Sequence, residues 1–129
     1  MHLSIAPLYV GPLVLLYIWL ATRVALYRKS SKVSFGDGDD RELLRRTRAH
    51  GNCAEYMPIG VVLLVIVELT GAPALVVHLL GVALVLSRVM HAYAFVVRPM
   101  NYVVRRYGML LNLGMMLVTG LGIFFHALL

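Results

Sequence analysis

Charged and amide side chains that could bind an anion occur inside a segment that is otherwise apolar. Arg48, Asn52 and Glu55 follow one another at spacings of four and three residues, so on a helix they share one face. The apolar run after them, residues 59–67, is too short to cross a bilayer, which takes about 20 residues. A spanning helix must therefore carry Asn52 and Glu55 at hydrocarbon depth, where a carboxylate is costly and indicates a functional site.

A second polar set lies in the next apolar segment. Arg88, His91 and Phe95 share a helical face. Counted from the Gly-Ala-Pro turn at 71–73, Glu55 and Arg88 lie at the same depth, about 20 Å, so we expect them to meet. Because more cations than anions gather at this level, a small anionic ligand is the expected partner. The alternative is a buried ion pair that only fixes the helix register.

Composition shows which elements position these residues. The chain has 129 residues, of which 60% are hydrophobic and 14% charged, which is too apolar for a soluble domain of this size. The net charge of +6 comes from basic residues clustered between apolar segments, so membrane topology explains it better than nucleic-acid binding does. The single cysteine excludes an intrachain disulfide and a Cys-rich metal site.

The apolar segments predict an all-α membrane protein: one domain, residues 1–129, with four transmembrane helices in a left-handed-type bundle. The spans are expected at about 5–27, 40–70, 74–96 and 105–128. Asp39 and Glu42 resemble a capping box at the start of the second helix. The basic residues flank the first and third loops, so the positive-inside rule puts these loops in the cytoplasm and both termini outside.

Three other kinds of site, each limited to a few residues, have less support in the sequence. The aspartates at 37–40 lack the ligand spacing of a calcium loop. His50 and His91 suggest a metal, but no further ligands accompany them, so none is expected. Cys53 could act as a nucleophile, although a buried apolar packing role is the commoner one for such a residue.

The tract Arg48-Ala-His-Gly-Asn52-Cys-Ala-Glu55-Tyr56-Met-Pro58 resembles the signature of the MAPEG family, the membrane-associated proteins in eicosanoid and glutathione metabolism. The Arg88-Val-Met-His91 tract, the Gly-Asp-Gly-Asp-Asp turn and the four-span layout are also similar to that family. The short chain looks most like its bacterial microsomal glutathione transferase branch, which implies an inner-membrane location.

The resemblance implies a homotrimer that binds glutathione between subunits near the cytoplasmic face and transfers it to a hydrophobic electrophile or hydroperoxide from the bilayer. It implies that Arg105, or as second choice Arg106, stabilises the thiolate. Phe95 departs from the family pattern, because several members have a glutathione-contacting tyrosine there. The glutathione-binding residues that the resemblance implies are Arg23, Arg48, Asn52, Glu55, Tyr56, Arg88, His91 and Tyr93.

Two other functions compete with this hypothesis. One is a non-catalytic lipid-binding scaffold of the same family, which Phe95 leaves open. The other is a small proton-coupled multidrug exporter that uses Glu55 as its proton carrier. The arginines around Glu55 argue against the exporter, because they favour the charged form of the acid.

Overall fold

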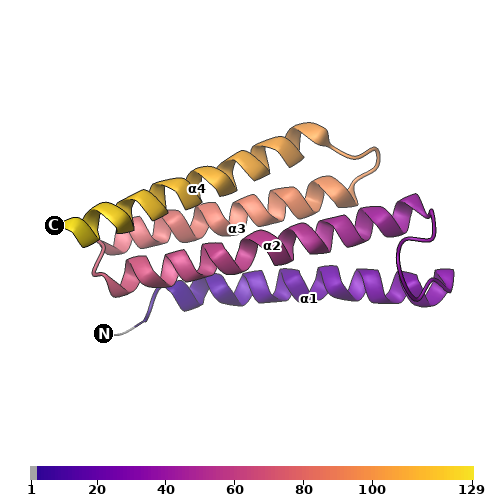
Figure 1. Cartoon of the computed structure of the whole chain (residues 1–129), viewed down its shortest axis with the longest axis horizontal. Helices are drawn as coiled ribbons and strands as arrows, with labels where there is room; N and C mark the ends of the chain where they lie inside the picture. Colours follow the sequence, from indigo (N-terminus) through magenta and orange to yellow (C-terminus); the bar gives the residue numbers. More distant parts are fainter. Residues whose placement is uncertain (1–2) are drawn as a thin grey trace.

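The computed structural model describes residues 3–129, and this part of the chain folds into four helices without a strand. The helices lie side by side along the long axis of the molecule (Figure 1). Each is long and apolar enough to cross a membrane, which confirms the predicted all-α chain with four spans. They are α1 (Ala6–Ser31), α2 (Arg41–Leu69), α3 (Ala74–Val96) and α4 (Tyr102–Leu128).

The chain runs up and down, so its loops alternate between two ends. The α1–α2 and α3–α4 loops lie at one end, which we call the basic end; it comprises residues 28–48 and 97–106 (Figure 1). The α2–α3 turn and both termini lie at the opposite end. α2 and α3 form the central pair, since each contacts both α1 and α4, whereas α1 and α4 do not touch within the described residues.

Two helix boundaries differ from the expected ones. α1 continues to Ser31 instead of ending near 27, and it stops where Lys32 adopts a left-handed conformation with φ of 58°. α4 begins at Tyr102 rather than at 105, because the side chain of Asn101 accepts a hydrogen bond from the backbone N–H of Val104 at 3.0 Å.

The cap of α2 is Asp40, so the assignment of this role to Asp39 was wrong. Asp40 Oδ1 accepts hydrogen bonds from the N–H groups of Glu42, at 2.8 Å, and Leu43, at 3.1 Å. Asp39 has a left-handed φ of 59° and belongs to the turn. The Leu43 N–H, followed by the Tyr27 hydroxyl at 2.9 Å, lowers the pKa of Asp40 because both hydrogen bonds favour the ionised carboxylate.

The interior contains two apolar clusters with a polar layer between them. Leu84 and Met115 belong to the cluster at the opposite end. Cys53 and Phe95 belong to the cluster at the basic end. The side chains between these levels are buried and polar: Ser87, Arg88, His91 and Asn112. A site that needs buried polar groups therefore lies in the basic half of the bundle.

α3 and α4 approach closely at this polar layer because residue 108 is a glycine. A Cβ at Gly108 would lie 3.0 Å from the His91 nitrogen and 3.1 Å from the Ser87 carbonyl oxygen. Both of these are backbone atoms, which cannot move aside like a flexible side chain. Gly108 thus sets the distance between the two helices that carry Arg88, His91 and Arg105.

Candidate functional site

Two adjoining hollows open on the α2, α3 and α4 side of the basic end. The first, here the His91 hollow, has a volume of about 420 Å³ and is lined by Asn52, His91, Tyr102, Arg105, Arg106, Met109 and Leu110. The second, here the Arg48 hollow, has a volume of about 440 Å³ and is lined by Arg41, Leu44, Arg45, Arg48, Phe95, Met100, Tyr102 and Arg105. Tyr102 and Arg105 border both. Neither hollow is lined by Asp or Glu, so their combined surface suits an anion.

Arg88 lies behind the His91 hollow and is only 2% exposed. Its Nη1 donates to Oδ1 of Asn52 at 3.0 Å, and its guanidinium carbon lies 5.6 Å from the centre of the Tyr56 ring. Its Nε and Nη2 are buried and have no partner among the described residues. Since buried donors are nearly always paired, these two nitrogens indicate an acceptor from outside the described chain.

Aromatic rings connect His91 to Arg105. The ring centres of His91 and Phe95 are 5.1 Å apart, and the guanidinium carbon of Arg105 lies 5.0 Å above the Phe95 ring. Phe95 is 7% exposed, so it is a fixed platform on which the arginine rests. At this position a phenylalanine orients Arg105 across the mouth of both hollows, although it has no hydroxyl to bind a ligand.

One carboxylate organises part of the arginine cluster. Glu42 accepts from Arg45 at 2.8 Å and from Arg46 at 2.7 Å, and it also pairs with Arg98 of the α3–α4 loop. These are the three ion pairs within residues 3–129. The arginines that border the hollows without an acidic partner in the described chain are Arg41, Arg48, Arg105 and Arg106.

The expected contact between Glu55 and Arg88 is wrong for the single subunit. Glu55 is exposed, and the side-chain partner of Arg88 is Asn52. The reason is helical geometry. Glu55 follows the buried Cys53 by two positions, or about 200° around α2, so it points away from the core. Residues three or four positions apart lie on the same side of a helix, but this side is broad. Asn52 can therefore contact Arg88 while Glu55 does not.

The structure brings together most of the other predicted residues. Asn52, His91, Arg105 and Arg106 line the His91 hollow, and Arg48 lines the Arg48 hollow. Arg88 and Tyr56 lie next to them, as described above.

Two predicted residues lie elsewhere. Arg23 on α1 stacks on Trp19, with its guanidinium carbon 4.9 Å from the ring centre, and lines neither hollow. Tyr93 is exposed on α3 and also lines neither hollow. Arg23 is half-buried, whereas Tyr93 and Glu55 are exposed.

Sequence reasoning missed three residues of this region. Tyr102 and Arg41 line the hollows, and Glu42 holds the arginines around them. The spacing of Glu42 to Arg45 and Arg46, three and four residues, is a recognisable helix ion-pair pattern. No comparable signal marks Tyr102, whose role depends on where α4 begins.

His50 and Cys53 pack against aromatic and apolar neighbours. His50 packs against Tyr17 with ring centres 4.9 Å apart, and Cys53 is buried in the apolar cluster of the basic end. Within residues 3–129, no group of three or more His, Cys, Asp or Glu side chains is placed to hold a metal.

Sequence comparisons agree with this architecture. The model of the MAPEG family matches residues 6–125. The chain is 37% identical over 105 residues to inner membrane protein YecN of Escherichia coli K12, covering 81% of this chain and 79% of that protein. The same values hold for YecN of Escherichia coli O6:H1. No solved structure matches.

Proposed function

This chain belongs to the MAPEG family, and from that premise we propose that it is a glutathione-dependent membrane transferase. In this proposal glutathione is a cosubstrate bound at the basic end, and its sulfur attacks a hydrophobic electrophile. A hydroperoxide is the second electrophile that we propose for the same thiolate.

The proposal rests on the two hollows, which are lined by arginines and by no acidic residue. Behind them lie the two unpaired nitrogens of Arg88. Glutathione is a flexible tripeptide with two carboxylates and one amine. Arginine binds carboxylates through paired, charge-assisted hydrogen bonds, so a cluster of arginines fits such a ligand better than a neutral one. Asn52 and His91 supply further polar contacts in the same hollow.

Arg105 is the residue that we assign to the thiolate, with Arg106 as the second choice. A free thiol has a pKa of about 8.5, so only a few per cent is ionised at neutral pH. A guanidinium next to the sulfur favours the charged form and so increases the reactive fraction. Arg105 borders both hollows and rests on the buried Phe95 ring, which makes it the better positioned of the two.

Assembly as a homotrimer would complete this site. Glu55 is exposed on the outer side of α2, and Arg23 and Tyr93 lie outside both hollows. In a cyclic trimer each subunit offers such side chains to its neighbour. We propose that Glu55 from an adjacent subunit holds the glutathione amino group, while arginines hold the carboxylates.

The membrane supplies the second substrate in this proposal. Met109 and Leu110 form an apolar wall of the His91 hollow, and Leu110 is exposed where bilayer lipid would contact α4. The relative from Escherichia coli is named an inner membrane protein, so we propose the same membrane here. The basic end would then face the cytoplasm and both termini the outside, in accordance with the positive-inside rule.

Purified protein in detergent tests the proposal. Glutathione binding is measured by calorimetry, and conjugation with an aryl halide by absorbance. The expected result is saturable binding, with turnover lowered about 100-fold or more in Arg105→Ala, as for loss of an electrostatic catalytic group. Absence of both binding and turnover would reject the enzyme and favour a lipid-binding scaffold. Full turnover in Arg105→Ala with loss in Arg106→Ala would move the role to Arg106.

A further inference from the structure

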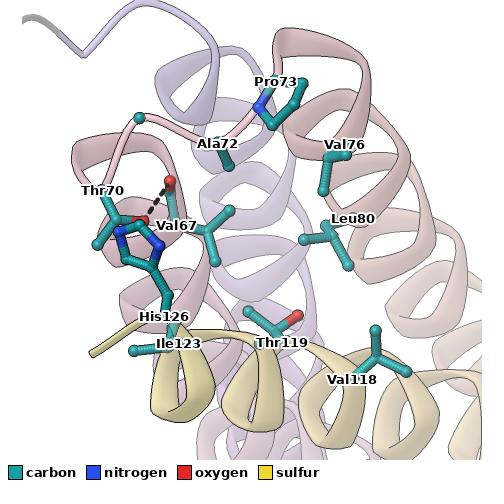
Figure 2. A pocket seen from close by; sticks show the side chains of 12 residues that line it. Val67, Thr70, Ala72, Pro73, Val76, Leu80, Val118, Thr119, Ile123 and His126 are labelled. Carbon is teal, nitrogen blue, oxygen red and sulfur yellow. Dashed lines mark hydrogen bonds between the residues drawn. The ribbon is translucent and has the colours of Figure 1, made fainter. Parts of the chain in front are cut away.

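A third hollow lies at the opposite end of the bundle, away from the arginines. It has a volume of about 440 Å³ and is bounded by the ends of α2 and α4 and the start of α3 (Figure 2). On α3 its deepest residue, Leu80, precedes His91 by 11 positions, or about 16 Å along the helix. This distance separates the hollow from the glutathione site proposed above.

Its lining is mostly apolar, and its polar side chains are Thr70, Thr119 and His126. Thr70 and His126 lie at the rim, where α2 and α4 end, and Figure 2 labels Leu80 and Val118 in the deeper part. Leu80 is about 9 Å along α3 from its first residue, and Val118 is about 15 Å from the last residue of α4. No Lys, Arg, Asp or Glu lines the hollow.

The threonine hydroxyls leave little for a polar ligand to bind inside. Thr70 Oγ1 donates to the Val67 carbonyl oxygen at 2.9 Å, and the buried Thr119 Oγ1 donates to the Met115 carbonyl oxygen at 2.6 Å. His126, at the rim, makes no hydrogen bond with another described residue, so its ring N–H can donate to an acceptor there. The inner part is thus suited to hydrocarbon and the rim to an oxygen-containing group.

Gly122 lines the hollow and has open space beside it. A Cβ at Gly122 would have no atom within 4 Å, whereas at Gly108 the α3 backbone is already in contact. A side chain at position 122 would therefore enter the space of the hollow instead of meeting α3. Val76, Val118 and Gly122 are exposed on spanning helices, so the hollow is open on its bilayer side and a hydrocarbon chain can enter it.

We propose that this hollow binds one acyl chain of a bilayer phospholipid, with the polar part of that lipid at His126. A lipid in the membrane leaflet at this end has its oxygen atoms at the membrane surface and its hydrocarbon beneath. This arrangement matches the rim and the inner part of the hollow. The volume falls within the range of ligand pockets, about 300–1,000 Å³. This site is independent of the proposed transferase activity, and its test does not use that activity.

The test is photolabelling in phosphatidylcholine vesicles that contain a phosphatidylcholine with a diazirine midway along one acyl chain. Labelled positions are mapped by mass spectrometry. Leu80 and Ile123, half-buried walls of the hollow, are expected to label at least as strongly as Leu117 and Leu121, which are exposed on another side of α4 and do not line the hollow. Labelling of Leu117 and Leu121 alone, as when a second copy covers the hollow, would overturn the proposal.

Two leucine variants distinguish labelling inside the hollow from labelling of the lipid-exposed surface in general. In Gly122→Leu the new side chain fills the space, so labelling of Leu80 and Ile123 should fall by about fivefold or more. Gly114→Leu is the control, because a Cβ at Gly114 would also have no atom within 4 Å and this residue does not line the hollow. Unchanged labelling in Gly122→Leu would overturn the proposal. If Gly122→Leu fails to fold, the labelling pattern of the wild-type protein still decides the outcome.

Discussion

Arg88 is a charged side chain in the middle of the bundle whose only hydrogen-bond partner within residues 3–129 is an amide. A buried guanidinium with two unpaired nitrogens is unfavourable for folding, and a ligand that pairs with these nitrogens would offset the cost. Stability and ligand binding therefore make opposite demands on this position.

Replacement of Arg88 by methionine should separate these demands. We expect Arg88→Met to keep the stability of the ligand-free protein or raise it by about 1 kcal/mol, because an apolar side chain of similar length removes the buried charge. The thermal shift that glutathione produces in the wild type should disappear. Thermal unfolding in detergent, with and without glutathione, measures both effects. A loss of more than about 2 kcal/mol would identify Arg88 as a structural residue instead.

Asn52 provides the contrasting variant. Asn52→Ala keeps the buried charge and removes the oxygen that pairs with it at 3.0 Å, so it should destabilise the ligand-free protein by about 1–3 kcal/mol. The same unfolding measurement applies. If Asn52→Ala is as stable as Arg88→Met, water or lipid must already pair with the guanidinium.

At the scale of elements, helix ends depend on side chains from elsewhere in the chain. Glu68, near the end of α2, accepts hydrogen bonds from the N–H groups of Ser4, Ile5 and Ala6 at 2.7–2.8 Å, so it caps α1. α1 has no side-chain cap of its own. This carboxylate fixes the first helix to the second at the opposite end.

Hydrogen exchange can test the cap. Glu68→Ala should remove about 1 kcal/mol or more of protection from the amides of residues 4–6, because three donors lose their acceptor. Glu68→Gln keeps one carbonyl oxygen and should show a smaller loss. Equal exchange in wild type and Glu68→Ala would mean that water replaces the carboxylate without cost.

The α3–α4 contact gives a prediction with an internal control. Gly108→Ala should destabilise the protein by about 1–3 kcal/mol, since its Cβ meets backbone atoms of α3 at 3.0–3.1 Å. Gly114→Ala, on the same helix but in open space, should be neutral or stabilising by up to about 1 kcal/mol. Thermal unfolding of both variants measures the difference. Equal effects would show that helix propensity, rather than the interhelix distance, decides.

The elements were more predictable than the contacts between them. Apolar length is a property of each segment alone, so the four helices and the turn near residue 71 follow from the sequence. The partner of Arg88 depends on how α2 is rotated against α3. The sequence offered Asn52 and Glu55 within one turn, and only packing selects Asn52. Tyr102 joined the site because Asn101 starts α4 earlier than the hydropathy indicated.

At the scale of the whole molecule, the homotrimer proposed above makes a statement about Glu55 that can be tested. Glu55 is exposed on α2 and lines neither hollow, whereas Arg105 borders both. A site shared between subunits would combine Arg105 of one chain with Glu55 of the next. A site within one subunit would need both residues from the same chain.

Complementation between inactive subunits distinguishes these two arrangements. Arg105→Ala and Glu55→Ala, each expressed alone, should lose most conjugation activity. Co-expressed at equal levels, they should regain about a quarter of the wild-type activity, because in a cyclic trimer one site in four receives an intact Arg105 and an intact Glu55 from adjacent chains. Activity no higher than in either parent would place both residues in one subunit, and an active Glu55→Ala parent would remove Glu55 from the site. Co-expression of Arg105→Ala with an Arg105→Ala/Glu55→Ala double variant is the matched control. No chain in that mixture carries an intact Arg105, so its activity should stay at the level of the parents.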